Sequence, residues 1–259
     1  MRKILRHVCV LVAILMIIFN ALSVCAAQNK YSWYCAHKAG HLQPSSDKSL
    51  SFIDKYDGFY IDKNHGDECL DKVIYLTFDA GYENGNVSKI LDVLKQESVP
   101  AAFFVLGAII RKNTDVVVRM FDEGHLVCNH TYSHKSMANI DKSYFCEELE
   151  RLENACFEYT GRQIARYYRP PEGVFDEQSL AYAKEMGYKT VFWSFGYPDW
   201  DNGKQMDKDA AKRKILDNVH NGEIMLLHPT SATNAAILCD VIREIKAMGY
   251  RFGSLDELK

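Results

Sequence analysis

Ionisable side chains follow short apolar runs at several points of this chain of 259 residues. An Asp, an Arg or a His stands at each of these points, and the set comprises Asp79, His130, His134, Arg169, Asp199 and His228. If the runs are parallel strands whose carboxyl ends lie together, these side chains converge on one mouth, which is where a barrel enzyme keeps its chemistry. The sequence therefore predicts one catalytic site built from strand ends.

His130 and His134 have the spacing of a metal site. Two imidazoles at positions i and i+4 lie on one face of a helical turn, about 5–6 Å apart, which lets both rings reach one divalent cation. Histidines so placed are also common as surface or packing residues, so the spacing alone leaves both interpretations open. The apolar run directly before them, residues 126–128, favours the metal.

Asp79 and His228 are of the residue types that serve as general base and general acid. A carboxylate beside a metal-bound water can take its proton, and an imidazole on the opposite side can donate one to a leaving amine. Arg169 beside Asp79 would hold the carboxylate ionised, because an adjacent cation lowers a carboxyl pKa. Asp199 would orient an imidazole or the arginine. The alternatives are a turn or helix-cap role for Asp79 and a core histidine at His228.

The composition and the motifs that are missing disfavour several classes of function. With 47% hydrophobic and 25% charged residues, the chain suits one globular domain of the size that barrels reach. Its formal net charge of -3 gives no basic field of the kind that nucleic-acid-binding proteins use, so we expect no nucleic-acid partner. The chain has no Gly-x-Ser-x-Gly elbow, which disfavours a serine hydrolase. Apart from Asp199, no second carboxylate at a strand end partners Asp79 as in a glycosidase.

The N-terminus has the pattern of an export signal. Basic residues at positions 2, 3 and 6 precede an apolar stretch from 8 to about 22, and small residues follow at 24–27. We therefore expect a signal peptide over residues 1–27, with an uncleaved membrane anchor as the alternative. An exported protein can keep disulfides, and a Cys35–Cys69 pair would tie down the region after the signal, but the sequence leaves the pairing open.

From residue 72 onward, strand-like runs alternate with helical patterns. The helical segments carry apolar stripes that mark core-facing surfaces, such as the stripe of Val87, Ile90 and Leu94. This alternation predicts an α/β fold of about seven parallel strands, and an irregular barrel fits it better than an open sheet. Residues 28–71 lack a clean period and are predicted to be an N-terminal extension that wraps a domain over 72–259. The strand-like runs span 73–78, 101–105, 126–128, 167–168, 190–195 and 224–227, with a weak seventh at 251–252.

Five short motifs stand at the predicted strand ends. They are TFDAG at 77–81, HTYSH at 130–134, RPPEG at 169–173, DW at 199–200 and LLH at 226–228. In this order they strongly resemble the motifs of the polysaccharide deacetylases of the NodB-homology type, from about residue 72 to the C-terminus. Segments 56–60, 81–85, 173–175 and 191–194 are similar to those of the muramic acid de-N-acetylases that prepare the δ-lactam of bacterial spore cortex.

The resemblance implies a distorted (β/α) barrel that removes acetyl groups from N-acetylated sugars. The implied site has a base and an acid, two residues that support their charges, and two histidines that bind a divalent cation, for which we expect zinc. By resemblance, Asp79 is the base and His228 is the acid. Arg169 and Asp199 support their charges, and His130 and His134 bind the cation.

Four further residues are candidates for substrate contact. Tyr132 and Trp200 offer apolar walls on which a sugar ring could sit, with core packing as the alternative for each. A backbone N–H between Pro171 and Gly173 is expected to hold the oxyanion of a tetrahedral intermediate.

The chain departs from the family pattern at two positions. Most relatives carry a second acidic residue, a metal ligand, where this chain has Ala80, so we expect a two-histidine site completed by water and substrate, with reduced metal affinity. Glu172 stands where relatives often have an aromatic or basic residue. A basic side chain could contact a muramic lactyl carboxylate, whereas Glu172 would repel one if it pointed into the groove.

The function we expect is cation-assisted de-N-acetylation of a peptidoglycan sugar, most specifically N-acetylmuramic acid during δ-lactam formation. The alternatives are deacetylation of N-acetylglucosamine or chitin oligomers, removal of O-acetyl esters, and a non-catalytic glycan-binding barrel that has lost its metal. The expected partners are peptidoglycan glycan strands, and we expect a monomer that is exported and acts in the cell wall, the medium or the spore-cortex space.

Overall fold

The computed structural model describes residues 29–258. The predicted signal peptide over residues 1–27 lies outside this range. None of the helices between residues 29 and 258 has the length and apolar character needed to cross a bilayer.

The main sheet is parallel at every ladder. Its strands are β4 (Gly58–Phe59), β5 (Val73–Ala80), β6 (Ala102–Val105), β7 (Leu126–Asn129), β8 (Ala165–Tyr168), β10 (Lys189–Val191), β11 (Phe195–Gly196), β12 (Glu223–Leu227) and β13 (Arg251–Phe252). They follow the order β11-β12-β5-β6-β7-β8-β10-β4, and β13 pairs with β5. No ladder joins β11 to β4 within residues 29–258, so the sheet forms a half-barrel. The α/β fold predicted from the sequence is confirmed.

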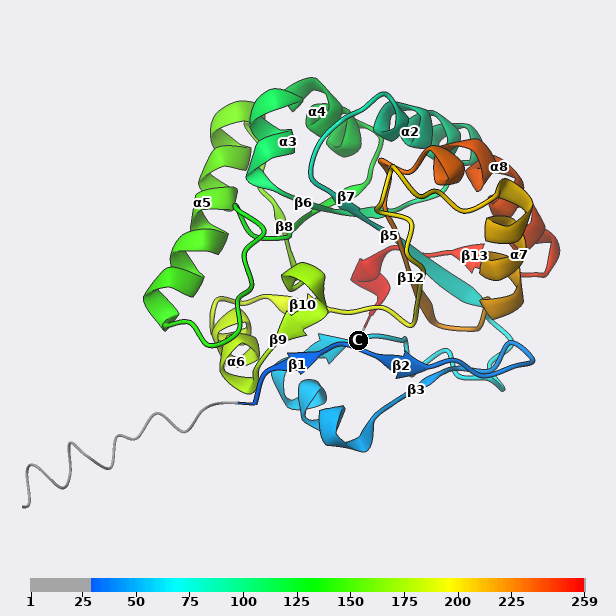
Figure 1. The fold of residues 1–259 in the computed structure, drawn as a ribbon, viewed down its shortest axis with the longest axis horizontal. Helices are drawn as coiled ribbons and strands as arrows, with labels where there is room; N and C mark the ends of the chain where they lie inside the picture. The colour runs from blue at the N-terminus through cyan, green and yellow to red at the C-terminus, as the bar shows by residue number, and fades with distance from the viewer. Residues whose placement is uncertain (1–28, 259) are drawn as a thin grey trace, which may run out of the picture.

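The helices form an arc around the outer face of the sheet (Figure 1). They are α2 (Asn86–Glu97), α3 (Gly107–Lys112), α4 (Thr114–Asp122), α5 (Lys142–Thr160), α6 (Glu177–Glu185), α7 (Lys208–Asn218) and α8 (Ala232–Ala247). Side chains cap the starts of several helices, as Asp141 does for α5 and Ser231 for α8, and thereby satisfy backbone N–H groups that lack partners within the helix.

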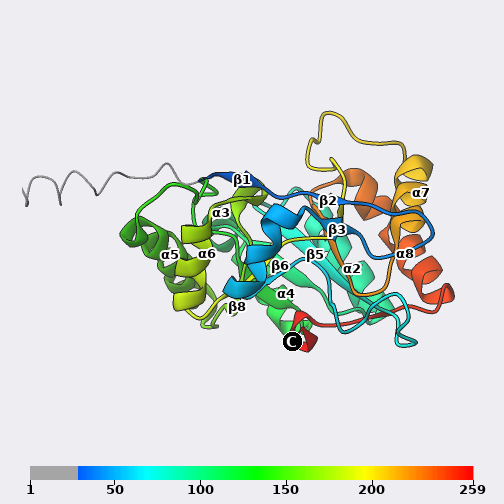
Figure 2. The ribbon, with the colours of Figure 1, turned by 90° about the horizontal axis from the view of Figure 1, so that it is seen from below.

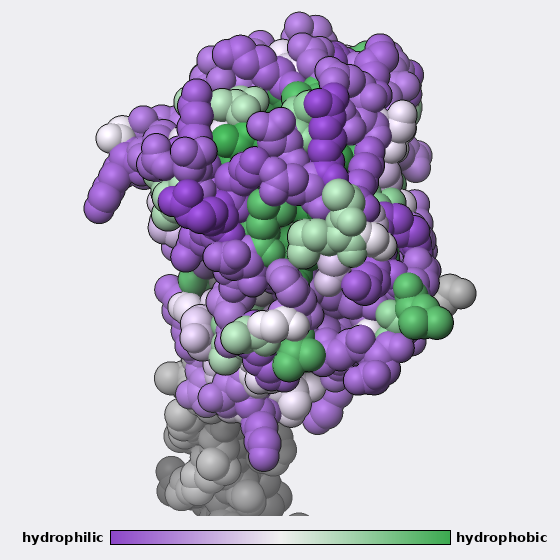
Figure 3. Space-filling view, turned by 90° about the vertical axis from the view of Figure 1, so that its right-hand side faces the viewer, coloured by the Kyte–Doolittle hydropathy of each residue, from purple (hydrophilic) through white to green (hydrophobic). Residues whose placement is uncertain are grey.

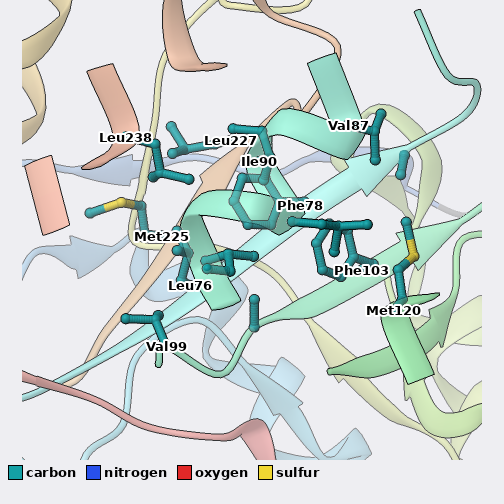
Figure 4. Packing of buried hydrophobic residues seen from close by; sticks show 14 of the residues in the cluster. Leu76, Phe78, Val87, Ile90, Val99, Phe103, Met120, Met225, Leu227 and Leu238 are labelled. Carbon is teal, nitrogen blue, oxygen red and sulfur yellow. The ribbon is translucent and has the colours of Figure 1, made fainter. Parts of the chain in front are cut away.

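Residues along β5 alternate between two apolar cores. Ile74, Leu76, Phe78 and Ala80 pack against the helices in an outer cluster, part of which is seen in Figure 4. Val73 and Tyr75 belong to an inner cluster inside the half-barrel. Successive side chains of a strand point to opposite faces, so Asp79 lies on the inner face and Ala80 on the outer one.

The surface beside α7 and α8 is mostly hydrophilic, with small separate apolar patches (Figure 3). The apolar residues of α8, such as Leu238, Val241 and Ile242, are buried against the sheet and its neighbouring helices. Burial of this stripe accounts for the polar character of the outward face.

The N-terminal extension lies along the side of the sheet that the arc of helices leaves uncovered (Figures 1 and 2). It contains β1 (Tyr31–Ser32), β2 (Cys35–Ala36), β3 (Ser45–Ser46), the 3-10 helix η1 (Lys48–Tyr56) and β4. Strand β1 pairs antiparallel with β9 (Val174–Phe175), while β4 extends the main sheet beside β10. The extension thus contributes backbone ladders to the fold. All six cysteines of the described residues are free thiols, Cys35 and Cys69 included.

Two local expectations differ from the structure. The run 190–195 was expected to form one strand, but it divides into β10, which pairs with β8 and β4, and β11, which pairs with β12. Residues 130–134 were expected to form a helical turn, but they form a loop. Thr131 and His134 have φ values of 67° and 60°, in the left-handed region that interrupts a right-handed helix.

Candidate active site

A cleft of about 600 Å³ opens at the carboxyl ends of the strands. Asp79 lies at the end of β5, His130 follows β7 and His228 follows β12, and all three line the cleft together with His134. Because the strands are parallel, their carboxyl ends share one edge of the sheet. The convergence proposed from the sequence therefore exists, although the chemical roles of these residues remain proposals.

Arg169, directly after β8, connects Asp79 to the sheet. Its side chain is fully buried. Its Nη1 donates to Asp79 Oδ1 at 2.8 Å, its Nη2 to Thr77 Oγ1 at 2.9 Å and its Nε to the Val191 carbonyl at 3.0 Å. The guanidinium also lies 4.1 Å from the centroid of the Phe104 ring. These contacts fix the arginine as a rigid positive support beneath the carboxylate.

The charges around Asp79 decide its protonation state. Burial would raise the pKa of its carboxyl, but the neighbouring His130, Arg169 and His228 side chains outweigh burial and lower the pKa. Asp79 is therefore ionised in the neutral range and able to accept a proton.

The ring of His130 is oriented by the backbone. Its Nδ1 lies 2.8 Å from the Arg169 carbonyl oxygen, and because a carbonyl only accepts, Nδ1 carries the hydrogen. Burial lowers the pKa of His130 to about 4, so the neutral ring presents an unprotonated Nε2, 3.5 Å from Asp79 Oδ2. The His134 ring lies 4.9 Å away, centroid to centroid.

Side chains around the loop hold the two histidines in this arrangement. Asn129 Oδ1 accepts from the N–H of Thr131 at 2.9 Å, and Thr131 Oγ1 accepts from the N–H of His134 at 3.0 Å. Glu148 of α5 accepts from the N–H of Ser133 at 2.9 Å. The loop is thus fixed by polar side chains rather than by helical hydrogen bonds.

The donor set fits a divalent cation that is held by few protein ligands. His130 Nε2 is an acceptor when the ring is neutral, and Asp79 Oδ2 is an acceptor when the carboxyl is ionised. A positive group between them would satisfy both atoms. Residues 29–258 contain no cluster of three or more His, Cys, Asp or Glu arranged to hold a metal. Ala80 adds no ligand, because its methyl group lies in the outer core.

The opposite side of the cleft is built around Asp199, which is 1% exposed. Its Oδ1 accepts from His228 Nδ1 at 2.7 Å, and its Oδ2 accepts from the N–H of His228 at 2.8 Å and from Asn234 Nδ2 at 2.5 Å. Tyr197 in turn donates to Asn234. Burial would lower the pKa of His228, but the hydrogen bond and the negative charge of Asp199 outweigh burial and raise it.

Apolar residues form the remaining walls of the cleft. Trp200 is 59% exposed and its ring lies 5.8 Å from the His228 ring, centroid to centroid. Tyr82 receives a hydrogen bond on its hydroxyl from Asn202 at 2.7 Å, which links two loops beside the cleft. Trp193 lines the cleft as well. This wall can support the face of a sugar ring.

Tyr132 is not brought to the cleft. It lines a separate hollow beside α3 and α5, where Arg151 lies 3.9 Å from the centroid of its ring and Arg111 donates to its hydroxyl at 3.1 Å. The side chain fills the space above Gly107, since a Cβ at that glycine would come within 2.5 Å of the ring. Tyr132 packs the histidine loop against α3, and no contact with a sugar in the cleft follows from its position.

The turn over Pro171–Gly173, called η2, is the other substrate-contact candidate. Pro171 is buried and has no N–H, and the N–H of Gly173 already donates to the Pro170 carbonyl at 3.0 Å. Glu172 and Gly173 both line the cleft and both have left-handed φ values, 58° and 65°. The N–H of Glu172 is thus the backbone donor of this turn that no described hydrogen bond occupies.

Trp33 of the extension packs against this turn and against the cleft wall, a contact that no sequence motif indicates. Its N–H donates to the Gly173 carbonyl and its indole Nε1 to the Trp193 carbonyl, both at 2.8 Å. Its ring stacks on Phe192, with 4.5 Å between the centroids. A Cβ at Gly173 would lie 2.7 Å from the Trp193 ring and 3.1 Å from Trp33 Cβ, so glycine is required there.

Sequence reasoning also missed the supporting contacts of Thr77 and Asn234 and the wall formed by Tyr82 and Trp193. Thr77 is the first residue of the TFDAG motif, and Tyr82 and Trp193 belong to the segments 81–85 and 191–194, so these motifs were the available signals for them. Asn234 and Trp33 carry no such signal, because folding alone brings them to Asp199 and Gly173.

Comparisons with known proteins agree with the arrangement. A family model described as polysaccharide deacetylase matches residues 67–191. The peptidoglycan-N-acetylmuramic acid deacetylase PdaA of Bacillus subtilis is 40% identical over 228 residues, which cover 88% of this chain and 85% of that protein. The peptidoglycan-N-acetylglucosamine deacetylase PgdA of Listeria monocytogenes is 33% identical over 72% of this chain and 39% of its own length.

Solved structures give the same result for the fold. The structure of Bacillus subtilis PdaA, described as a family 4 carbohydrate esterase, superposes with a TM-score of 0.84 at 39% identity, over 89% of this chain and 97% of that one. A family 4 carbohydrate esterase from Bacillus anthracis superposes with a TM-score of 0.72 at 39% identity, over 89% and 96%.

Proposed function

Because this chain belongs to the polysaccharide deacetylase family, we propose that it removes the acetyl group from N-acetylmuramic acid residues of peptidoglycan. The observation that carries the proposal is the pairing of Asp79 and His228 across one cleft, with pKa values shifted in opposite directions. Such a pair supplies an ionised base and a protonated acid at the same pH. The similarity to PdaA over most of both chains supports muramic acid as the sugar.

In the proposed reaction, Asp79 accepts a proton from water as the water oxygen attacks the acetyl carbonyl carbon. The tetrahedral intermediate collapses when the carbon–nitrogen bond breaks, and His228 gives its proton to the sugar nitrogen. The products are acetate and the free amine of the sugar. The N–H of Glu172 is the proposed donor to the oxyanion, as backbone N–H groups are in other acyl-transfer sites.

His130 and His134 are the residues that would hold a divalent cation, with zinc as the proposed metal. A bound cation would polarise the acetyl carbonyl and lower the pKa of water to about 7. The fixed tautomer of His130 suits this role, since its Nε2 is left as a ligand.

The supporting residues of the proposal act through these groups. Arg169 keeps Asp79 ionised and oriented, and Asp199 keeps His228 protonated and fixes its ring. Trp200 would stack against a sugar ring. We further propose that the protein is exported to the cell wall and acts in spore-cortex peptidoglycan; this setting rests on the sequence motifs alone.

The test is acetate release by the mature protein from peptidoglycan glycan strands, with and without stem peptides and with and without added zinc. Mass analysis of the digested glycan would locate the new amine. Free amines on muramic acid, formed only with the cation, are the expected result. Amines on glucosamine alone would change the proposed sugar, and binding without acetate release would favour a non-catalytic barrel.

A further inference from the structure

A buried chain of hydrogen bonds runs from α8 to the proposed acid. Asn234 lies in the first turn of α8, and its side chain is 1% exposed. Its Nδ2 donates to Asp199 Oδ2 at 2.5 Å, and its Oδ1 accepts from the hydroxyl of Tyr197, which is also buried. Asp199 Oδ1 in turn accepts from His228 Nδ1 at 2.7 Å. Neither Asn234 nor Tyr197 lines the cleft, so any influence of theirs on the reaction reaches it through Asp199.

The donor and the acceptor at each step of this chain are fixed by chemistry. An ionised carboxylate only accepts hydrogen bonds, so the amide nitrogen of Asn234 must face Asp199 and the amide oxygen must face Tyr197. Burial and the negative charge of Asp199 raise the pKa of Tyr197, which keeps the hydroxyl protonated and able to donate. The Tyr197 hydroxyl therefore holds the amide in the one orientation that serves Asp199.

Asp199 depends on these donors because it has no arginine or lysine partner. Within residues 29–258 its one ion-pair partner is His228, in contrast to Asp79, which Arg169 holds at 2.8 Å. In the described part of the chain, Asp199 Oδ2 accepts from two groups, the N–H of His228 at 2.8 Å and the amide of Asn234. Loss of the amide would leave a buried oxygen short of a donor and free the carboxylate to rotate.

The first turn of α8 is anchored to the loop that carries Asp199. Ser231 Oγ accepts from the N–H of Asn234 at 3.1 Å and donates to Gln205 Oε1 at 2.5 Å. Gln205 Nε2 donates to the Asp199 carbonyl at 2.9 Å. Asn234 is thus held at a fixed distance from Asp199, as a residue that orients another must be.

From these contacts we infer that Asn234 is a positioning residue for the proposed acid, and that Tyr197 holds Asn234 in the orientation that this role requires. The inference rests on the proposed function. Asn234 fixes the carboxylate of Asp199, and the carboxylate fixes the His228 ring through Nδ1. Nε2 is then the ring nitrogen left to give a proton in the cleft, which His228 lines.

The first test is the steady-state kinetics of acetate release from peptidoglycan glycan strands by Asn234→Leu, which keeps the size of the side chain and removes its hydrogen bonds. We expect kcat to fall about threefold to tenfold, the rate equivalent of one hydrogen bond. KM should stay near the wild-type value, because the residue does not touch the substrate. Tyr197→Phe should have a smaller effect in the same direction. The double variant should lose no more than Asn234→Leu, because Tyr197 acts through Asn234.

Proton NMR of the same variants gives a readout that does not need activity. The Nδ1 proton of a histidine that is hydrogen-bonded to a carboxylate gives a resonance at low field, and the resonance of His228 is identified by its absence from His228→Ala. In Asn234→Leu and in Tyr197→Phe this resonance should shift or broaden, because the carboxylate that holds the proton is no longer fixed.

Asn221→Leu is the matched control. Asn221 is also a buried amide, but it accepts from the N–H of Val73 and donates to the Gly66 carbonyl, at the end of β5 remote from Asp79. This variant should lose thermal stability and keep the wild-type kcat and the wild-type resonance.

Two results would overturn the inference and leave the proposed function intact. One is a wild-type kcat with an unchanged resonance in folded Asn234→Leu or, if that variant does not fold, in Tyr197→Phe. The other is an equal change of kcat and resonance in Asn221→Leu. Failure of the wild-type protein to release acetate would instead overturn the proposed function, while the resonance would still report whether Asn234 positions His228.

Discussion

The two sides of the cleft are each built on a carboxylate, Asp79 on one side and the buried Asp199 on the other, and the pKa shifts on the two sides run in opposite directions. Asp79 accepts a hydrogen bond from Arg169, and the neighbouring His130, Arg169 and His228 side chains lower its pKa against the effect of burial. Asp199 accepts a hydrogen bond from His228, and this bond and the negative charge of Asp199 raise the pKa of the histidine. Residue type alone does not decide which group keeps a proton; the partner at hydrogen-bond distance does.

Two histidines of the cleft also differ in pKa because their partners differ. His130 is paired with a backbone carbonyl and loses its proton easily, with a pKa of about 4 caused by burial. His228 is paired with a carboxylate and holds its proton. One imidazole is therefore prepared as a ligand or acceptor and the other as a donor.

The largest loss of activity is expected from removal of one member of the proton-transfer pair. Asp79→Asn and His228→Ala should each lower kcat by a factor of about 10² to 10⁴, the range for general acid or base catalysis. Initial rates of acetate release measure this, with thermal melting as the control for folding. A nearly normal rate in either variant would remove that residue from the mechanism.

Dependence of acetate release on a divalent cation tests whether His130 is a metal ligand. If the proposed cation takes part, chelation should abolish acetate release by the wild-type protein and added zinc should restore it, because a site with alanine at position 80 would hold a cation by few protein ligands. His130→Ala should lose at least the 10- to 100-fold that follows loss of an outer partner of a metal ligand, and zinc should not rescue it. Activity that persists under strong chelation would contradict the metal proposal.

The pH profile of kcat/KM distinguishes the effects of the two carboxylates. Asp199 raises the pKa of His228, so the acid stays protonated to a higher pH than a free imidazole would. In Asp199→Asn the alkaline limb of kcat/KM should move to lower pH, and kcat/KM at neutral pH should fall by less than the factor of about 10² to 10⁴ expected for loss of the acid itself. The acidic limb, set by Asp79, should not move. An unchanged alkaline limb would assign it to another group.

The smallest effect is expected at Trp33, which supports the wall between the two sides. Trp33→Phe keeps a ring against Phe192 but loses the indole hydrogen bond to the Trp193 carbonyl. The free energy of unfolding should fall by about 0.5–1.5 kcal/mol, the net value of one hydrogen bond, while kcat stays near the wild-type value. Denaturant titration gives the first quantity; a large loss of kcat instead would show that the wall takes part in catalysis.

The extension illustrates what the sequence could not predict. Its aromatic residues have no periodic pattern, and only folding shows that β1 and β4 pair with β9 and β10. The loop at 130–134 was predicted as a helical turn because i, i+4 spacing suits one, but polar contacts from Asn129 and Glu148 hold it in another conformation. For Tyr132 the sequence left a sugar-facing wall and core packing open, and the structure places the ring beside α3 and α5, outside the cleft.

The βα alternation and the residue types at the strand ends follow from the amino-acid sequence alone, because local periodicity and short motifs specify both. It therefore predicted an irregular α/β barrel of parallel strands and the convergence of Asp79, His130 and His228. The tertiary structure decided which groups are partners across long separations, such as Arg169 with Asp79 and Trp33 with Gly173. The protonation states of Asp79 and His228 depend on such partners, because electrostatic interactions act through distance in space and not along the chain.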